Sequence, residues 1–114
     1  MSRVALVVDD DPAVLELIGE MLEELGCEVV SVQNGTEALV ALEENQRIEI
    51  LITDVNMSGI AGYDLAQAAK QLRPALKPIL LSGRETDSRG FPLLRKPFLQ
   101  NDLARVMKET TGLC

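Results

Sequence analysis

Val4-Ala-Leu-Val-Val-Asp-Asp-Asp-Pro12 is the first regular stretch of the chain. Residues 4–8 are all apolar and mostly β-branched, which predicts a short strand buried on both faces. The aspartates end that strand. Pro12 suits the first turn of a helix with Asp11 as its cap, and apolar residues recur beyond it at helical spacing as far as Gly26. A buried strand that leads through an acidic turn into an amphipathic helix predicts an α/β fold.

The rest of the chain repeats this alternation. We expect further strands over residues 27–32, 48–53, 78–81 and 93–95, the last being the weakest pattern. Helices are expected after the Asn34-Gly35 turn, after the loop that contains Gly59 and Gly62, and after Phe98. This order predicts one domain over residues 1–114, a doubly wound five-stranded parallel sheet with helices on both faces.

Composition and charge exclude several classes of protein. The 114 residues include 18 Asp and Glu against 11 Lys and Arg, a net charge of −7, which argues against direct binding to nucleic acid. No apolar run is long enough to span a membrane and no signal peptide is evident, so we expect a cytoplasmic protein. Histidine is absent, which excludes a phosphohistidine and a histidine-rich metal site. Cys27 and Cys114 show no metal-ligand spacing, and no disulfide is expected.

Chemically notable residues follow the predicted strands. Asp9 and Asp10 come after the first strand, Asp54 after the third, Ser82 after the fourth and Lys96 after the fifth. In an open parallel sheet, sites lie outside the carboxyl ends of the strands, where the strand order reverses. Each residue alone has an ordinary explanation as a loop acid, a turn residue or a solvated charge. Their combination at one edge of the sheet predicts a functional site.

The expected group of carboxylates needs a cation. Three aspartates in one cleft repel one another unless a positive charge neutralises them. Oxygen ligands without His or Cys suit a hard ion, and Mg²⁺ suits a site that receives a phosphoryl group. A carboxylate beside Mg²⁺ can attack phosphorus and form an acyl phosphate, while Lys96 and the Ser82 hydroxyl contact the phosphoryl oxygens. These residues therefore favour a phosphoryl acceptor.

Five short motifs occur in order along the chain. They are Val7-Val-Asp-Asp10, Asn34-Gly35 with Glu37-Ala-Leu39, Asp54-Val-Asn-Met-Ser-Gly59 with Gly62, Leu81-Ser-Gly83 and Lys96-Pro-Phe98. With them, the chain resembles the receiver domain of two-component response regulators over essentially its full length. The resemblance implies a flavodoxin-like sheet of strand order 2-1-3-4-5.

The resemblance also implies a role for each site residue. Asp54 is the expected phosphoacceptor, Ser82 the switch hydroxyl and Lys96 the phosphate-contacting lysine. The expected ligands of Mg²⁺ are Asp9, Asp10, Asp54 and the backbone carbonyl of Asn56. The expected partners are a histidine kinase or phosphotransfer protein and a downstream protein target, so the chain is a signalling module and not an enzyme with a separate substrate. The Lys96-Pro97 peptide bond is expected to be cis.

Three single residues depart from the family pattern. Ser58 stands where proline is usual, which predicts a less rigid loop after the phosphoacceptor. Leu93 stands where many receivers carry an aromatic residue that turns inward, so an aromatic switch at that position is not available. Leu99 replaces the usual polar cap of the last helix, a loss of about 1 kcal/mol if nothing substitutes for it.

The largest departure is a short segment before Lys96. Only 13 residues, 83–95, separate Ser82 from Lys96, and residues 83–90 contain no apolar side chain. A helix that covers a sheet needs an apolar stripe, so we expect the fourth helix to be shortened or missing. The sheet face near strands four and five is then under-covered, with Phe91 or a partner to shield it, and a homodimer through this face is one expected outcome.

Two other functions compete with the phosphoryl acceptor. One is a phosphorylation-independent, receiver-like interaction domain, which Leu93 and the short segment favour and the complete set of acceptor residues opposes. The other is a haloacid-dehalogenase-like phosphatase, because residues 9–11 contain Asp-x-Asp after a strand. That family needs more chain for its later acidic motif and its substrate cap, which makes it the weaker alternative.

Overall fold

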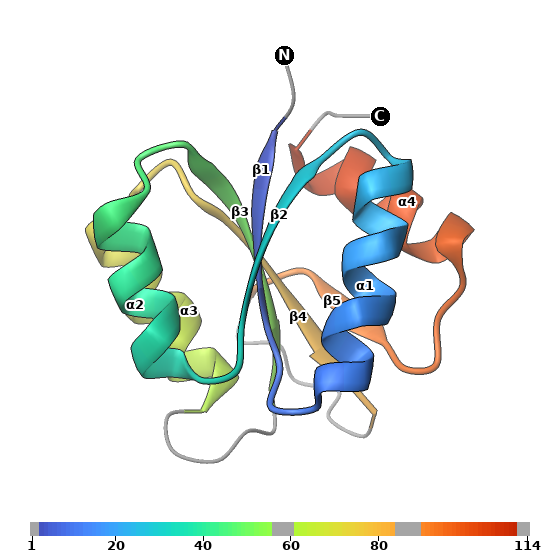
Figure 1. Cartoon of the computed structure of the whole chain (residues 1–114), viewed down its shortest axis with the longest axis horizontal. Coiled ribbons are helices and arrows are strands. Elements are labelled where there is room, and N and C mark those ends of the chain that lie inside the picture. The colour runs from blue at the N-terminus through green and yellow to red at the C-terminus, as the bar shows by residue number, and fades with distance from the viewer. Residues whose placement is uncertain (1–2, 56–60, 84–89, 112–114) are drawn as a thin grey trace.

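Strands and helices alternate from one end of the chain to the other (Figure 1). The structure, a computed structural model, describes residues 3–55, 61–83 and 90–111. In order, the elements are β1 (Val4–Val8), α1 (Pro12–Glu24), β2 (Glu28–Val32), α2 (Gly35–Glu44), β3 (Ile48–Asp54), α3 (Gly62–Leu72), β4 (Lys77–Ser82), β5 (Leu93–Arg95) and α4 (Gln100–Thr111). Every predicted strand is present, and no strand end differs from its prediction by more than one residue.

The five strands form one parallel sheet of order β2-β1-β3-β4-β5. This confirms the predicted doubly wound topology, in which the strand order reverses beside β1. All of β1 and nearly all of β3 and β4 are buried, because helices cover both faces of the sheet. Parallel strands bring their carboxyl ends to the same edge, at the bottom of Figure 1, where β1 leads into α1.

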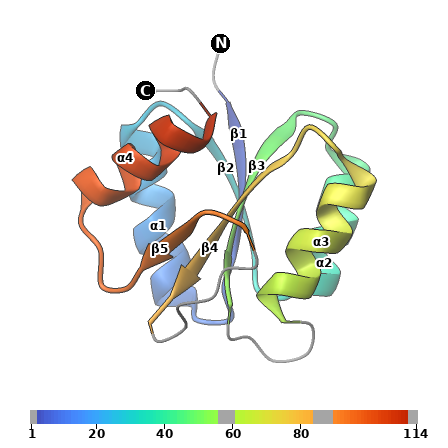
Figure 2. The same cartoon turned by 180° about the vertical axis from the view of Figure 1, so that it is seen from behind.

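Two helices cover each face of the sheet. Helices α2 and α3 lie on one side, and α1 and α4 on the other (Figures 1 and 2). Ala5 and Val7 of β1 belong to the apolar cluster under α1 and α4, whereas Leu6 and Val8 belong to the cluster under α2 and α3. Successive residues of a strand point to opposite faces, which is why β1 needs an unbroken apolar run.

The turn from β1 into α1 follows the sequence prediction. Asp11 is the N-cap of α1 and accepts a hydrogen bond from the backbone N–H of Ala13 at 3.0 Å, with Pro12 in the first turn. After the helix, Gly26 adopts a φ of 88°, which residues with a side chain rarely adopt. The short acidic turn therefore leaves Asp9 at the carboxyl edge of the sheet.

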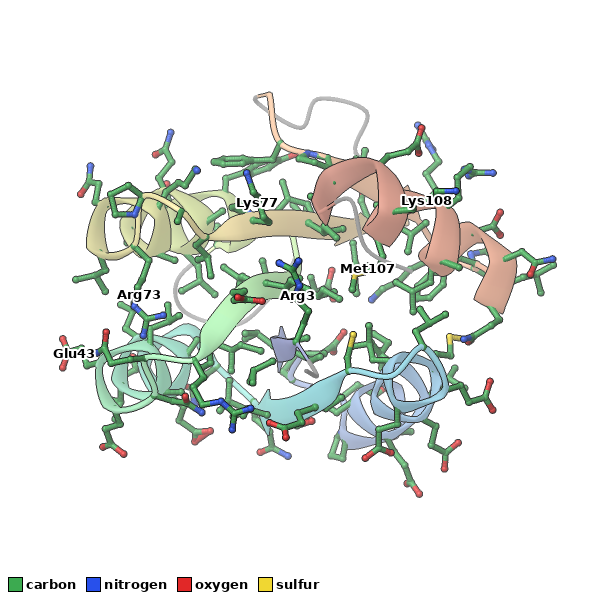
Figure 3. All side chains as sticks on the ribbon, turned by 90° about the horizontal axis from the view of Figure 1, so that it is seen from above. Arg3, Glu43, Arg73, Lys77, Met107 and Lys108 are labelled. Carbon is green, nitrogen blue, oxygen red and sulfur yellow. The ribbon has the colours of Figure 1, made fainter. Side chains whose placement is uncertain are left out.

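Arg73, directly after α3, ties that helix to the end of α2 (Figure 3). Its guanidinium donates to the backbone carbonyls of Leu42 and Asn45 at the end of α2, of Gln46 in the connection to β3, and of Ile48, the first residue of β3. The last carbonyls of a helix have no partner within the helix. The side chain that follows α3 therefore satisfies backbone acceptors at the end of α2 and at the entry to β3.

The start of α4 replaces its missing cap in part. Leu99 is highly exposed at 73% and has no side-chain oxygen to offer. The Asp102 carboxylate accepts a hydrogen bond from the Leu99 backbone N–H at 2.9 Å, which is one half of a capping box. The peptide bond between Lys96 and Pro97, which precedes this helix, is cis as expected.

The segment between β4 and β5 agrees with the predicted loss of a helix. Residues 77–83 and 90–95 contain no helix, and residues 84–89 lie outside the described part of the chain. Phe91, which leads into β5, is partly buried on this side of the sheet and shields β4 as expected. The small cluster here consists of Tyr63, Phe91 and Leu93 packed on the buried Val55, Ala66 and Leu80.

Candidate functional site

Four of the predicted site residues lie at the carboxyl edge of the sheet. Asp9 directly follows β1, Asp54 ends β3, Ser82 ends β4 and Lys96 directly follows β5. The strand pairing aligns these ends, since Asp54 lies opposite Leu81. The order β1, β3, β4, β5 therefore brings residues from distant parts of the sequence to neighbouring positions.

Asp9 is a buried carboxylate with both oxygens in use. Only 1% of the residue is exposed. Oδ1 accepts a hydrogen bond from the backbone N–H of Asp11 at 2.9 Å, and Oδ2 lies 3.3 Å from the ammonium of Lys96. Burial raises the pKa of the Asp9 carboxyl, and the hydrogen bond from Asp11 and the charge of Lys96 offset that rise only in part.

Lys96 joins Asp9 and Asp54. Its Nζ lies 3.3 Å from Oδ2 of Asp9 and 3.2 Å from Oδ2 of Asp54. Burial lowers the pKa of the Lys96 ammonium, but the negative charges of Asp54 and Asp9 outweigh burial and raise it overall. Its backbone N–H also donates to the Ser82 carbonyl at 2.8 Å. The lysine is thus fixed at both ends and stays charged at neutral pH.

Asp54 is the most accessible of the carboxylates that contact Lys96. Its side chain is 14% exposed, against 2% for Asp9. The backbone around it is held firmly, because the Val55 N–H donates to the Leu81 carbonyl at 2.9 Å and the Thr53 hydroxyl donates to the Asp54 carbonyl at 3.1 Å. A carboxylate that is reachable from solvent and rigidly placed beside a cation is suited to nucleophilic attack on an electrophile.

Ser82 is fully buried at the end of β4. Its carbonyl accepts a hydrogen bond from the backbone N–H of Lys96. Ser82, the last residue of β4, therefore lies beside Lys96, the residue that follows β5. A small hydroxyl in this position can donate to a negatively charged oxygen of a group bound at Asp54. The structure therefore brings Asp9, Asp54, Ser82 and Lys96 to one edge, as the sequence predicts.

Asp10 does not join the carboxylate pair. The residue is exposed. Within the described ranges, no three side chains among Asp, Glu, His and Cys lie close enough together to hold a metal ion. Lys96 contacts Asp9 and Asp54 in this arrangement, and the expected role of Asp10 as a metal ligand stays a prediction. Asn56 and Ser58 lie outside the described residues, and the roles given to them stay predictions.

Comparison with known proteins identifies the chain. Residues 5–107 match the family model of the response regulator receiver domain. The chain belongs to this family. Receiver domains are signalling modules of two-component phosphorelays and not classical enzymes, so the fold and the signalling function expected from the motifs are confirmed. None of the helices that the structure describes is long and apolar enough to cross a membrane.

The receiver domain has relatives in sensor proteins and in regulators. It is 31% identical to the sensor protein GacS of Pseudomonas syringae pv. syringae over 95% of its own length. It is 32% identical to the transcriptional regulatory protein GlrR of Escherichia coli (strain K12) over 81% of its length. The chain spans 13% and 22% of these longer proteins, so their complete activities are not carried over to it.

Solved structures agree with the family match. A response regulator receiver domain protein from Clostridium thermocellum is 30% identical and superposes with a TM-score of 0.86 over 94% of this chain and 92% of that one. The chemotaxis protein CheY4 of Vibrio cholerae has a TM-score of 0.89 at 22% identity, over 96% and 99% of the two chains. The second comparison bears on the fold alone.

Sequence reasoning missed some of the groups that hold the site in place. The backbone N–H of Asp11 orients Asp9, and the buried Thr53 hydroxyl contacts the Asp54 carbonyl. Gly62 was a motif residue without a role, yet its N–H donates to the Val55 carbonyl beside Asp54. Thr53 directly precedes Asp54 within β3 and Gly62 is the first residue of α3, and these positions beside the acceptor are the signal that the sequence offered.

Proposed function

We propose that this receiver domain accepts a phosphoryl group on Asp54 from a histidine kinase or phosphotransfer protein. The observation that carries the proposal is the ammonium of Lys96, which lies 3.2 Å from Asp54 and 3.3 Å from Asp9. A fixed positive charge beside an accessible carboxylate lowers the repulsion that an incoming phosphoryl group meets.

The reaction at Asp54 is a single displacement. A carboxylate oxygen of Asp54 attacks the phosphorus of the donor's phosphohistidine, and the phosphorus–nitrogen bond breaks as the new phosphorus–oxygen bond forms. The electron pair of the broken bond stays on the donor's imidazole, which takes up a proton from solvent. Lys96 would balance negative charge on one phosphoryl oxygen, and the Ser82 hydroxyl would donate to another.

The donor set suits Mg²⁺. Asp9 and Asp54 supply carboxylate oxygens that already share one cation, Lys96, and Mg²⁺ is usually held by one or two carboxylates with water and phosphate oxygens. We propose that Asp9, Asp54, the neighbouring Asp10 and the backbone carbonyl of Asn56 hold the ion. When bound, it supplies charge neutralisation for the phosphoryl oxygens.

A groove beside the site supports docking of a protein donor. It has a volume of about 410 Å³ and lies between α1 and the residues that follow β5. Leu17, which is 52% exposed, contributes to it from α1, while Lys96, Pro97 and Phe98 form the opposite wall. Apolar surface beside Lys96, which contacts Asp54, gives a donor helix a place to dock while its phosphohistidine reaches Asp54.

The test is phosphoryl uptake from a small donor. The chain is mixed with acetyl phosphate and Mg²⁺, and its intact mass is followed with time. We expect a mass increase of one phosphoryl group that is lost when Mg²⁺ is chelated and is absent in Asp54→Asn. The same uptake in Asp54→Asn would place the acceptor elsewhere.

Uptake also separates this proposal from its alternatives. An interaction domain that no longer uses phosphorylation, which Leu93 favours, would show no mass change under any of these conditions. A phosphatase of the haloacid-dehalogenase type would turn over a phosphomonoester, but Asp11, the second aspartate of the Asp-x-Asp, is exposed and caps α1. The cytoplasmic location, the downstream protein target and the homodimer through the face near β4 and β5 stay predictions.

A further inference from the structure

Gly62, the first residue of α3, lies directly against the backbone of the proposed acceptor. Its N–H donates to the carbonyl of Val55 at 3.1 Å. A Cβ atom added at this position would lie 2.8 Å from the Cα of Val55 and would meet the carbonyl oxygen of Asp54 even more closely. Such approaches are shorter than van der Waals contact, so a residue with a side chain cannot occupy this place without movement of the backbone.

Neither side of this contact has room to move. Asp54 pairs with Leu81 in the centre of the sheet, and the N–H of Val55 donates to the Leu81 carbonyl at 2.9 Å. Helix α3 is fixed from behind, because Leu65 and Ala66 in its first turns are fully buried. A side chain at position 62 therefore has to displace either the end of β3 or the start of α3.

Position 62 requires glycine because of the lack of space around it and not because of its backbone conformation. The described glycines with positive φ are Gly26 and Gly90, and nothing lies within 4 Å of a Cβ built on either of them. Gly62 shows the opposite combination. At Gly62, the close approach of a helix to a strand decides the residue type.

We propose that Gly62 is a positioning residue for Asp54. By allowing α3 to contact the end of β3, it fixes the Asp54 backbone and, through it, the direction of the carboxylate toward Lys96. Gly62 has no side chain to contact a substrate, so it acts only through Asp54. The inference rests on the proposed function, since it concerns the geometry of the phosphoryl acceptor.

The test compares Gly62→Ala with a matched glycine replacement. Gly19 lies on α1, and a Cβ there would lie 3.7 Å from Cγ1 of Val29, an ordinary contact, so Gly19→Ala is the control for the chemical change. Because Gly62→Ala alone is expected to lower stability, it is made in a stabilised background. That background carries Gly19→Ala, which favours the helix, and Ala61→Ser, which supplies the side-chain cap that α3 lacks.

Uptake from acetyl phosphate at saturating Mg²⁺ is then compared with the melting temperature. We expect Gly62→Ala in the stabilised background to fold with a wild-type melting temperature but to take up phosphoryl groups about 10- to 100-fold more slowly. The background alone is expected to react at the wild-type rate. An unchanged rate in the folded Gly62→Ala variant would overturn the proposal. Failure of that variant to fold would overturn it too, in favour of a purely structural role.

Backbone amide spectra keep this inference distinct from the proposed function. We expect Gly62→Ala to shift the amide signals of Asp54 and Val55, and Gly19→Ala to leave them in place. If the wild-type chain takes up no phosphoryl group, the proposed function fails and the amide shifts alone decide the role of Gly62. Unchanged Asp54 and Val55 signals in Gly62→Ala would then exclude a positioning role.

Discussion

Nζ of Lys96 lies 3.2 Å from Oδ2 of Asp54, although 42 residues separate them in the sequence. The same ammonium lies 3.3 Å from Asp9, so one cation serves a buried carboxylate and a more accessible one. A lysine in this position competes with a metal ion for the two carboxylates and also balances the charge of a phosphoryl group. Lys96 is therefore expected to raise the rate of phosphoryl uptake and to lower the affinity for Mg²⁺.

Lys96→Ala is expected to slow phosphoryl uptake on Asp54 about 10- to 100-fold, because a fixed charge beside the developing negative charge is lost. Mg²⁺ is expected to bind this variant more tightly than wild type, since the competing ammonium is gone. Mass spectrometry with acetyl phosphate measures the first effect and isothermal titration calorimetry the second. Lys108→Ala is the control, because Lys108 is exposed in the last turn of α4. Weaker Mg²⁺ binding in Lys96→Ala would contradict the idea of competition.

Asp9→Asn is expected to stabilise the metal-free protein at pH 7, because a neutral amide avoids the cost of burying a charged carboxylate. Burial raises the pKa of Asp9 above 3.8, so the folded protein holds this proton more tightly than the unfolded protein does. The contribution of Asp9 to the free energy of unfolding is therefore largest below its pKa in the unfolded chain. It falls as the pH rises through the raised pKa of the folded protein, and it stays low at higher pH.

Urea unfolding in the presence of a chelator tests this prediction for Asp9. The difference between wild type and Asp9→Asn is expected at pH 7 and is expected to shrink as the pH falls below the folded pKa, where the carboxyl of Asp9 is protonated. The same variant is expected to lose affinity for Mg²⁺. A wild-type protein more stable than Asp9→Asn at pH 7 without metal would show that the ion pair with Lys96 outweighs burial.

Arg73→Ala is expected to lower the free energy of unfolding by about 2–3 kcal/mol, because four backbone carbonyls lose their guanidinium donor. Arg73→Lys keeps the charge but not the planar set of donors, so we expect it to recover only part of the loss. Urea unfolding measures both variants. Arg105→Ala is the matched control, since its side chain is 64% exposed and forms surface ion pairs with Asp102 and Glu109 of the same helix. Equal effects of Arg73→Ala and Arg105→Ala would refute the role of Arg73 as a tie between helices.

Leu99→Ser is expected to raise the free energy of unfolding by about 0.5–1 kcal/mol, because serine can cap the exposed N–H groups of α4. The substitution removes no core contact, since Leu99 is 73% exposed. It also leaves the existing bond from the Leu99 N–H to Asp102 in place, which completes a capping box. Thermal unfolding followed by circular dichroism measures the change. A lower melting temperature would mean that Leu99 packs against something in solution.

The site was predictable to the extent that it depends on strand ends. Asp9, Asp54, Ser82 and Lys96 could be placed because each follows an apolar run, and parallel strands carry their ends to one edge. Asp9 and Asp10 are adjacent residues of one turn and look alike in sequence, yet Asp9 contacts Lys96 whereas Asp10 is exposed. Which side chain of a turn enters a site depends on its backbone angles, which composition does not specify.

The sequence by itself determined the order of the elements, because the periods of apolar residues, the cap at Asp11 and the Asn34-Gly35 turn are local signals. Only the tertiary structure decided the contacts across the chain. Lys96 contacts Asp9, 87 residues away in the sequence, and Arg73 contacts Leu42, 31 residues away. Position 62 has to be glycine because the backbone of Asp54 lies against it. Such contacts depend on how closely a helix approaches a strand, and that distance is set by the packing of the whole core.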